Sequence, residues 1–240
     1  MALLEVQGLT KVYPKFTLDG VSFSVEAGRI MGLIGRNGAG KTTTLKSILN
    51  IVHPDAGEIR YFGLPLAEHE NEIKCRVGYA GGAVDFYRRK SIRKILDVTR
   101  QFYPNWDDEA CRKYLKAFAL DETKTPGELS EGMRVKLSLT MALSHRAELL
   151  ILDEPTSGLD PVSRAELLDI FRALKEQGTA ILFSTHITTD LEACADDITY
   201  LREGTLLASE PMEVFLRRGA SLEEIMVSYE KEDWREKLAE

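Results

Sequence analysis

The sequence predicts an α/β fold, with a parallel sheet as its core, a β-rich part at the N-terminus and a helical lobe inserted into the chain. Three observations predict it. Short apolar segments alternate with helix-like segments after His145, and such alternation forms parallel sheets with right-handed crossovers. The first sixty residues contain short strand-like segments broken by Gly and Pro. Between these two parts, residues 83–145 carry the apolar spacing of helices.

The N-terminal part supplies strands and the first helix. Strands are expected, in order, over residues 3–6, 21–25, 30–34 and 58–61. The third of them runs into a glycine-dense loop, after which residues 41–50 have the composition of a helix. Residues 53–57, His-Pro-Asp-Ala-Gly, are expected to form a turn.

The helical lobe contains two helices whose starts can be placed. Asp107 is expected to cap the first of them. Its apolar residues follow the i, i+4, i+7, i+8 spacing of a buried stripe, which consists of Ala110, Tyr114, Ala117 and Phe118. The second helix is expected to begin at Ser130.

The last part of the chain returns to strands and helices in alternation. Residues 149–152 are an all-apolar segment typical of a central parallel strand. Asp160 then offers an N-cap, with Pro161 at the first helical position. The apolar face of this helix consists of Leu167, Leu168, Phe171 and Leu174. Gly178 ends the helix, and residues 180–183 are the next buried strand.

The whole chain, residues 1–240, is expected to form one domain. No internal repeat and no low-complexity tract divides it. Its parts are expected to be a β subdomain with the phosphate-loop core (1–82), the helical lobe (83–145), the rest of the core (146–208) and a helical C-terminal tail (209–240).

Composition excludes several classes of protein. With 44% hydrophobic and 29% charged residues, the chain has the make-up of an ordinary soluble globular protein. No apolar segment approaches the roughly 18–20 residues of a membrane span, and Glu5 stands where a signal peptide would be basic or apolar. Three widely spaced cysteines form neither a disulfide framework nor a metal cluster, so we expect a cytoplasmic protein. A net charge of −7 argues against a nucleic-acid partner.

A glycine-rich motif lies between the strand at 30–34 and the helix that follows. It matches G-x-x-x-x-G-K-[ST] and consists of Gly35, Arg36, Asn37, Gly38, Ala39, Gly40, Lys41 and Thr42. Glycines let the backbone wrap a phosphate group, to which successive N–H groups and the helix N-terminus offer positive potential. Lys41 would reach the β- and γ-phosphates, Thr42 is placed to ligate Mg²⁺, and Thr43 completes the binding segment. The alternative is a glycine-rich turn with an accidental Lys. In its strand-to-helix context, the motif predicts that the chain binds a nucleoside triphosphate.

Two acidic residues end the apolar strand at 149–152. Asp153 lies where such sheets hold Mg²⁺ beside the γ-phosphate. Glu154, one residue on, points elsewhere and is the natural group to polarise an attacking water. His186 follows another buried strand at its carboxyl end, where such sheets bind ligands, and is expected to contact the γ-phosphate. Two solvated acids and a structural His are the alternatives, and the phosphate loop favours the catalytic interpretation.

Two further motifs carry a family resemblance. Residues 129–133, Leu-Ser-Glu-Gly-Met, resemble the signature motif of the ABC ATPases. Residues 152–160, Leu-Asp-Glu-Pro-Thr-Ser-Gly-Leu-Asp, resemble the magnesium-site, catalytic-glutamate and D-loop sequence of that family. Together with the phosphate loop and the Ser-Thr-His at 184–186, the resemblance spans residues 1–210. It implies a RecA-like core with an antiparallel β subdomain before it and the helical lobe inserted.

The resemblance also implies roles for particular residues. Tyr13 occupies the position of the aromatic residue that stacks on adenine, and a strand-end Tyr packed on Pro14 is the alternative. Ser130 and Gly132 correspond to signature residues that contact the γ-phosphate bound on the opposite subunit, and Asp160 would lie near the subunit junction. A helix N-terminus with free N–H groups suits an anion. Two chains would therefore enclose two nucleotides.

One position departs from the family pattern. In the family, the Val-Gly-Tyr at 77–79 is normally followed three residues on by a Gln that contacts Mg²⁺ and water and opens the linker to the helical lobe. That position here is Gly82, whose side chain can ligate nothing, and Gln101 lies too far along the chain to replace it. We expect the backbone or Asp85 to substitute, or the coupling to be weaker.

A second resemblance rests on fewer residues. The segments 102–107, Phe-Tyr-Pro-Asn-Trp-Asp, and 142–145, Ala-Leu-Ser-His, are similar to a subgroup of bacterial export-type ATPases encoded with separate membrane subunits. Some members of that subgroup are linked to antibiotic or peptide resistance. The aromatic cluster is expected to be core of the helical lobe, and a docking groove for a membrane partner is the alternative.

These resemblances imply an ATP- and Mg²⁺-dependent ATPase subunit that dimerises on ATP, as a homodimer or heterodimer. It would power a separate transmembrane permease, as part of an exporter, and reach the inner face of the cell membrane through that partner. One alternative is a soluble ABC-type ATPase acting on DNA or ribosomes, although no coiled-coil insertion, zinc module or second ATPase domain is present in the 240 residues. Another is a hydrolysis-poor regulatory subunit, motivated by Gly82.

Overall fold

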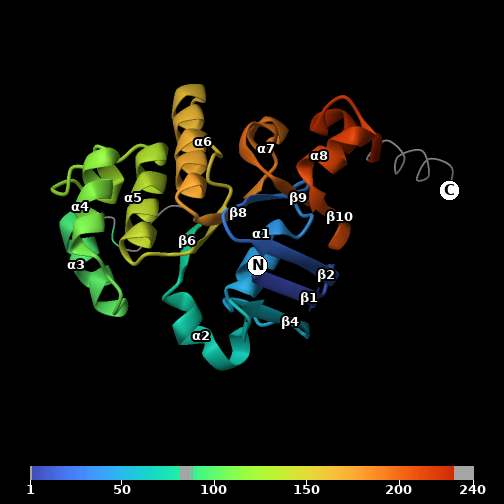
Figure 1. Ribbon diagram of the computed structural model, residues 1–240, viewed down its shortest axis with the longest axis horizontal. Coiled ribbons are helices and arrows are strands. Elements are labelled where there is room, and N and C mark those ends of the chain that lie inside the picture. The colour runs from blue at the N-terminus through green and yellow to red at the C-terminus, as the bar shows by residue number, and fades with distance from the viewer. Residues whose placement is uncertain (1, 82–86, 88, 230–240) are drawn as a thin grey trace.

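The computed structural model describes residues 2–81, 87 and 89–229. Gly82 and Asp85, the predicted start of the helical lobe at residue 83, and residues 230–240 of the predicted tail lie outside them. The described strands form a ten-stranded sheet in the order β5-β4-β1-β2-β10-β9-β3-β8-β7-β6. Helices cover both of its faces, and a group of three helices stands at one end of the molecule (Figure 1).

The core of the sheet is parallel, as the alternation of strands and helices predicts. Its strands are β6 (Val77–Gly81), β7 (Leu149–Asp153), β8 (Ala180–Thr185), β3 (Ile30–Ile34) and β9 (Asp197–Arg202). The register pairs Gly81 with Asp153, and Asp153 with Ser184. The carboxyl ends of these strands therefore meet at the same edge of the sheet, which is where ligands bind in such folds.

The N-terminal part is antiparallel. It consists of β1 (Ala2–Tyr13), β2 (Phe16–Glu26), β4 (Ala56–Tyr61) and β5 (Leu64–Pro65). A tight turn joins β1 to β2, so Tyr13 and Phe16 are register partners. The antiparallel part meets the parallel core through β2 and β10 (Thr205–Pro211), where Asp19 pairs with Thr205.

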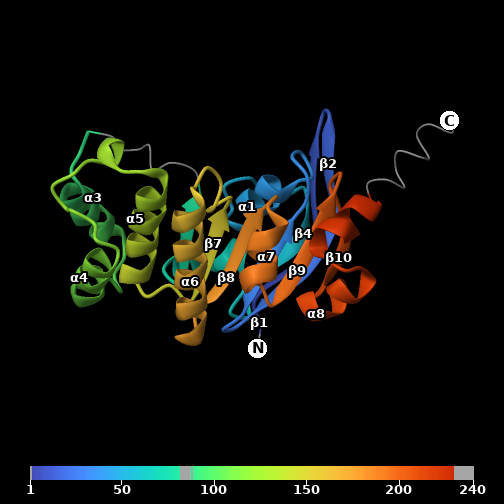
Figure 2. The ribbon, with the colours of Figure 1, turned by 90° about the horizontal axis from the view of Figure 1, so that it is seen from above.

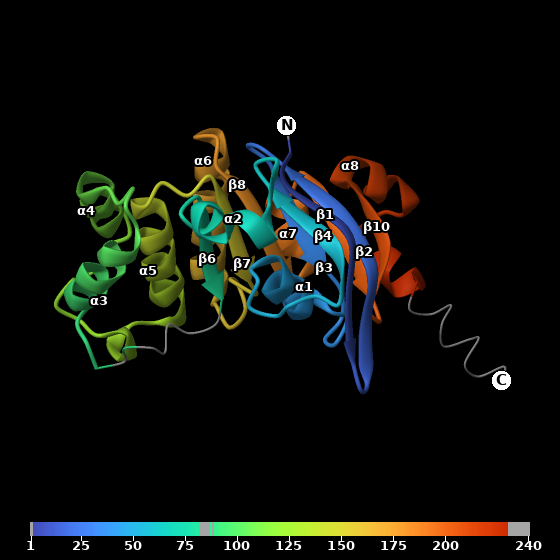
Figure 3. The same cartoon turned by 90° about the horizontal axis from the view of Figure 1, so that it is seen from below.

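Two apolar clusters pack on opposite faces of the sheet, because side chains alternate along a strand. Along β7, Leu150 and Leu152 belong to one cluster, and Leu149 and Ile151 belong to the other. The first cluster lies under α6 (Pro161–Glu176) and α7 (Thr188–Cys194), and the second lies under α1 (Lys41–Ile48) and α2 (Leu66–Lys74). The two opposite views show these helix pairs on opposite sides of the sheet (Figures 2 and 3).

The helical lobe consists of α3 (Ile92–Thr99), α4 (Asp108–Ala117) and α5 (Glu131–Ser144). Two 3₁₀ turns, Arg100–Phe102 and Pro126–Glu128, lie between them. The lobe has an apolar cluster of its own, formed by Ile92, Leu96, Cys111, Leu115, Leu120, Leu129 and Leu137. The predicted caps are confirmed: Asp107 accepts from the N–H groups of Glu109 and Ala110, and Ser130 accepts from that of Met133.

The predicted stripe of α4 is partly wrong. The fully buried residues of the helix are Cys111 and Leu115, whereas Ala117 is exposed. Tyr114 and Phe118 are half-buried and pack against the apolar cluster of the sheet, and Phe118 also packs against that of the lobe. The helix contacts two apolar clusters, so its buried surface is broader than one stripe and centred one residue further along.

The C-terminal part is more closely packed than a charged tail implies. After β10 come α8 (Met212–Phe215), a 3₁₀ turn (Leu216–Arg218) and a helical segment over residues 222–229. Leu222 and Ile225 are 0% and 2% exposed and belong to the core cluster under α6 and α7. Residues 209–211 belong to the strand β10, so the helical part begins at Met212.

Candidate nucleotide site

The phosphate loop connects β3 to α1, and its shape depends on glycine at several positions. A Cβ at Gly35 would lie 2.3 Å from the carbonyl oxygen of Leu201, so no larger residue fits there. Gly38 and Gly40 have φ angles of 86° and 108°, which L side chains rarely adopt. Gly40 is also the N-cap of α1, so the loop ends with the free N–H groups of a helix.

Lys41 lies at the centre of the site. Its side chain is 6% exposed, and its Nζ donates to the carbonyl of Gly35 at 2.8 Å and to that of Arg36 at 3.4 Å. The same Nζ lies 3.3 Å from Oε1 of Glu154. The loop carbonyls therefore hold a buried positive charge directly beside the acidic residue that the sequence singles out.

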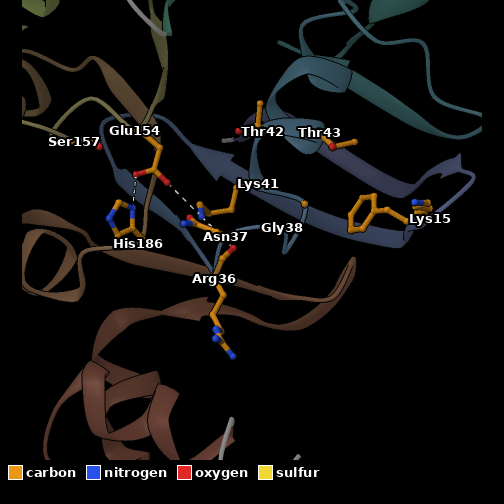
Figure 4. A pocket seen from close by; sticks show the side chains of 12 residues that line it. Lys15, Arg36, Asn37, Gly38, Lys41, Thr42, Thr43, Glu154, Ser157 and His186 are labelled. Carbon is orange, nitrogen blue, oxygen red and sulfur yellow. Dashed lines mark hydrogen bonds and ion pairs between the residues drawn. The ribbon is translucent and has the colours of Figure 1, made fainter.

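Glu154 has a backbone conformation that turns it away from the strand. Its φ of 51° lies in the left-handed region, which is rare for a residue other than glycine. Its N–H donates to Oγ and to the carbonyl of Ser184, at 2.9 and 3.2 Å, and these bonds hold the turn. As a result, Oε2 lies 2.8 Å from Nδ1 of His186, while Oε1 faces Lys41 (Figure 4). The structure thus brings the three predicted residues together.

Asp153 lies on the other side of the same strand end. Its Oδ1 accepts a hydrogen bond from Oγ of Ser184 at 2.6 Å and from Oγ1 of Thr42 at 3.3 Å. Carboxylate and hydroxyl oxygens are the ligands that Mg²⁺ prefers. The chemistry of Thr42 and Asp153 therefore fits this ion, and both lie next to the phosphate loop.

A cavity of about 730 Å³ opens in front of these residues. Its lining includes most of the phosphate loop together with Glu154, Ser157 and His186, and also Lys15 and Phe16 from the tip of the β1–β2 hairpin (Figure 4). Sequence reasoning missed Lys15 and Phe16, because only the hairpin carries them to the loop. The only local signal was their closeness to Tyr13.

Tyr13 is not one of the residues that line this cavity. Its side chain is 38% exposed, its ring centroid lies 6.4 Å from that of Phe16, and the ammonium group of Lys11 is 5.9 Å from its ring. The Phe16 ring instead lies against the loop, where its Cζ would be 3.0 Å from a Cβ at Gly40. Of the two neighbouring rings, Phe16 is the one that faces the phosphate loop.

Ser130, Gly132 and Asp160 lie together, away from the cavity. Ser130 is the exposed cap of α5, and Gly132 packs close to Ser163 of α6. Asp160 caps α6 and also accepts from the hydroxyl of Ser163, and this hydrogen bond is the main reason that the pKa of Asp160 is lowered. None of the three lines the cavity of its own chain.

Further features lie outside the cavity. Gln101 donates to the carbonyl of Asp97 and is exposed. All three cysteines are free thiols. Across the described ranges, no group of three His, Cys, Asp or Glu side chains is arranged to hold a metal ion. Nor is any described helix long and apolar enough to cross a membrane.

Comparisons with known proteins agree with the geometry. The family model of the ABC transporter matches residues 18–157. The chain is 33% identical over 230 residues to the bacitracin transport ATP-binding protein BcrA of Bacillus licheniformis, covering 94% of this chain and 75% of that protein. It is 36% identical over 215 residues to the Nod factor export ATP-binding protein I of Burkholderia orbicola (strain AU 1054), covering 87% of this chain and 70% of that protein.

Solved structures extend the comparison to the fold. The structure of an ATP-binding subunit of an ABC transporter superposes with a TM-score of 0.84 at 31% identity, covering 94% of this chain and 98% of that one. An ATP-binding cassette in its ADP conformation gives 0.78 at 22% identity, covering 95% and 99%, which shows the shared fold. The chain therefore belongs to the ABC transporter family, as an ATP-binding subunit with ATPase activity.

Proposed function

We propose that this chain hydrolyses Mg²⁺-bound ATP in the cavity beside Lys41, as one half of an ATP-dependent dimer that powers export by a separate transmembrane permease. The observation that carries the proposal is Glu154, whose two carboxylate oxygens lie 3.3 Å from Lys41 and 2.8 Å from His186. Few structural roles would require a carboxylate between a buried ammonium group and an exposed imidazole at the mouth of a phosphate loop.

The phosphate loop and Lys41 would bind the phosphate groups of ATP. The N–H groups at the start of α1 point into the cavity with the positive end of the helix dipole. Lys41 would give up its contacts with the loop carbonyls and contact the β- and γ-phosphates instead. Its attraction to the phosphates would be stronger there than in water, because the site is largely shielded from solvent.

The metal would be held by Thr42 and Asp153, whose oxygens already share a hydrogen bond. Bound there, Mg²⁺ would neutralise charge that develops on the phosphate oxygens. Ser184 keeps Asp153 in place and also bonds the N–H of Glu154, so a single buried hydroxyl positions both acids.

Glu154 would accept the proton of the attacking water or align it for attack on the γ-phosphate. His186 would fix the position of the Glu154 carboxylate and contact the γ-phosphate, because its ring lies at the rim of the cavity with its side chain 47% exposed. Both residues come from the carboxyl ends of neighbouring strands, so the sheet itself sets their spacing.

The second chain is proposed because Ser130 is exposed and neither it nor the half-buried Gly132 lines the cavity of its own chain. Ser130 and Asp160 cap α5 and α6 at adjacent helix starts, and Val162 beside them is 69% exposed. A surface that combines two helix N-termini with an exposed apolar residue suits a nucleotide phosphate presented by a partner chain.

Export is proposed from the relatives. One is named a bacitracin transport ATP-binding protein and another a Nod factor export ATP-binding protein. On this basis we propose that the chain serves an exporter whose permease is a separate subunit.

The test is Glu154→Gln, which keeps the shape of the side chain and removes its basicity. This variant should bind ATP normally, hydrolyse it at least about a hundredfold more slowly, and accumulate as a dimer on size exclusion with ATP and Mg²⁺. Adding Ser130→Ala should restore the monomer, and Lys41→Ala should abolish nucleotide binding. A purely monomeric Glu154→Gln protein, saturated with ATP, would refute the dimer. Copurification of the wild type from membranes would identify the permease.

A further inference from the structure

We propose that the hydroxyl of Tyr79 belongs to the metal side of the nucleotide site, as a positioning residue that orients water beside Asp153. The inference rests on the proposed Mg²⁺-dependent hydrolysis and adds to it a residue of the strand β6, which lies beside Asp153 and outside the lining of the cavity.

The position of the Tyr79 hydroxyl depends on residue 81 being a glycine, which has no side chain. Tyr79 and Gly81 are two residues apart on β6, so their side chains share a face of the sheet. A Cβ at Gly81 would lie 1.9 Å from Oη of Tyr79 and 2.3 Å from its Cζ. The phenol ring therefore runs along the strand and occupies the space that a side chain at position 81 would fill. Only glycine at position 81 permits this.

The register places Asp153 directly beside that space. Gly81 and Asp153 are paired residues of two parallel strands, and the burial pattern puts both on the face that carries α1. Neighbouring strands are about 4.8 Å apart, so the Tyr79 hydroxyl lies about one strand spacing from the Cβ of Asp153. Asp153 thus has three neighbours: Ser184 from β8, Thr42 from α1 and Tyr79 from β6.

The hydroxyl is free to act on water. Among the residues that the structure describes, it makes no hydrogen bond, and the Tyr79 side chain is 38% exposed. Within the described residues, the side-chain hydrogen bonds of Asp153 come from Thr42 and Ser184 and none comes from Tyr79, so a bridging water is the contact that suits this arrangement. Mg²⁺ usually keeps several of its waters, and outer groups that bind such waters set the orientation of the site.

A purely structural role for Tyr79 makes a different prediction. An aromatic ring that only covers the edge of the sheet would be replaced by Phe at little cost, since the two rings have the same shape. Metal-dependent binding would then be unchanged. The hydroxyl of Tyr79 is therefore the group to test, in a variant that keeps the aromatic ring.

The experiment measures the affinity of the full chain for a non-hydrolysable ATP analogue by calorimetry, once with Mg²⁺ and once with EDTA. The ratio of the two affinities gives the contribution of the metal. Tyr79→Phe should lower this ratio about threefold to tenfold, the worth of a single hydrogen bond, while the affinity in EDTA stays unchanged. Gly81→Ala, whose Cβ displaces the phenol, should reproduce the loss. Tyr114→Phe in the helical lobe is the matched control and should behave as wild type.

A second readout uses Mn²⁺ in place of Mg²⁺. The electron paramagnetic resonance spectrum of the bound Mn²⁺ should differ between wild type and Tyr79→Phe, because the ordering of its waters changes. An unchanged ratio and spectrum in Tyr79→Phe would overturn the inference, and so would an equal loss of affinity with and without metal. A wild type whose affinity does not respond to Mg²⁺ would overturn the proposed metal site itself.

Discussion

The ring of Tyr103 lies flat on the ring of His145, with centroids 3.9 Å apart and planes 5° apart. His145 ends α5, is 2% exposed, and donates from Nδ1 to the carbonyl of Cys75 at 3.1 Å, since a carbonyl can only accept. Asn105 donates to the same carbonyl and to that of His145, at 2.9 and 2.5 Å. Cys75 ends α2 just before β6, so these contacts tie the helical lobe to the core.

These contacts bear on the two interpretations of the aromatic segment 102–107. Tyr103 and Trp106 are half-buried, and Trp106 packs against the apolar cluster of the lobe. The N–H of Asp107 donates to the carbonyl of Ser144. Phe102 differs, because it is 73% exposed. Most of the segment therefore serves the packing of the lobe, and Phe102 is the residue left for an external contact.

We predict that His145 makes the stability of the fold depend on pH. Burial lowers the pKa of His145, and its hydrogen bonds oppose this effect. The neutral ring is then favoured in the folded state, so its contribution is complete above the unfolded pKa of about 6.5 and is lost as the pH falls through the lower folded pKa. Urea unfolding from pH 8 to pH 5 should show a declining free energy of unfolding.

The control is a histidine on the surface. His145→Gln should be less stable at pH 8 by about 1–3 kcal/mol, because it loses the stack and a buried hydrogen bond, and its stability should fall less between pH 7 and pH 5. His69→Gln, at a half-buried position on the surface of α2, should keep the wild-type pH profile. An identical slope in His145→Gln and the wild type would contradict the assignment of the pH dependence to His145.

We predict that Phe16 contributes more to binding of the adenine base than Tyr13 does. Phe16 lines the cavity and Tyr13 packs behind it, although the family resemblance assigns the stacking to Tyr13. Phe16→Ala should weaken ATP binding about threefold to tenfold, and Tyr13→Ala should weaken it less. Inorganic triphosphate, which has no base, should bind both variants as it binds the wild type. A larger loss from Tyr13→Ala would restore the original assignment.

We predict that Ser184→Ala slows hydrolysis much more than it weakens ATP binding. The Ser184 hydroxyl is buried and positions both Asp153 and Glu154, and Ser184 is not among the residues that line the cavity. The turnover number should fall about tenfold to a hundredfold, as for other residues that orient metal ligands. Thr199→Val removes a buried hydroxyl from the next strand but one and should leave turnover near the wild-type value. Comparable losses in the two variants would show a general effect on folding instead.

The local motifs of this site could be predicted from the sequence, because each depends on neighbours along the chain. The phosphate loop needs glycines at fixed positions before a helix, and residues 35–42 carry them. The caps Asp107, Ser130 and Asp160 were likewise predictable, since a cap bonds to N–H groups two or three residues on. The short all-apolar segments at 149–152 and 180–183 alternate with helices, and this order along the chain predicted a parallel sheet.

Contacts between distant segments could not be predicted in this way. The stripe of α4 was misplaced because two apolar clusters, not one, decide which of its residues are buried. Phe16 reaches the cavity only through the pairing of β1 with β2, and Ser184 meets Asp153 only through the register of β7 with β8. Such registers depend on how whole strands pack.

By itself, the sequence determined that this chain is a phosphate-loop ATPase with an inserted helical lobe, and which side chains are the candidates for its chemistry. The tertiary structure decided how those side chains face one another: Glu154 between Lys41 and His186, and Tyr79 in the space that Gly81 leaves beside Asp153. The physical reason is the separation along the chain between the residues that interact. Turns and caps are set by hydrogen bonds between residues a few positions apart, whereas the geometry of the site depends on strand order and register across the whole sheet.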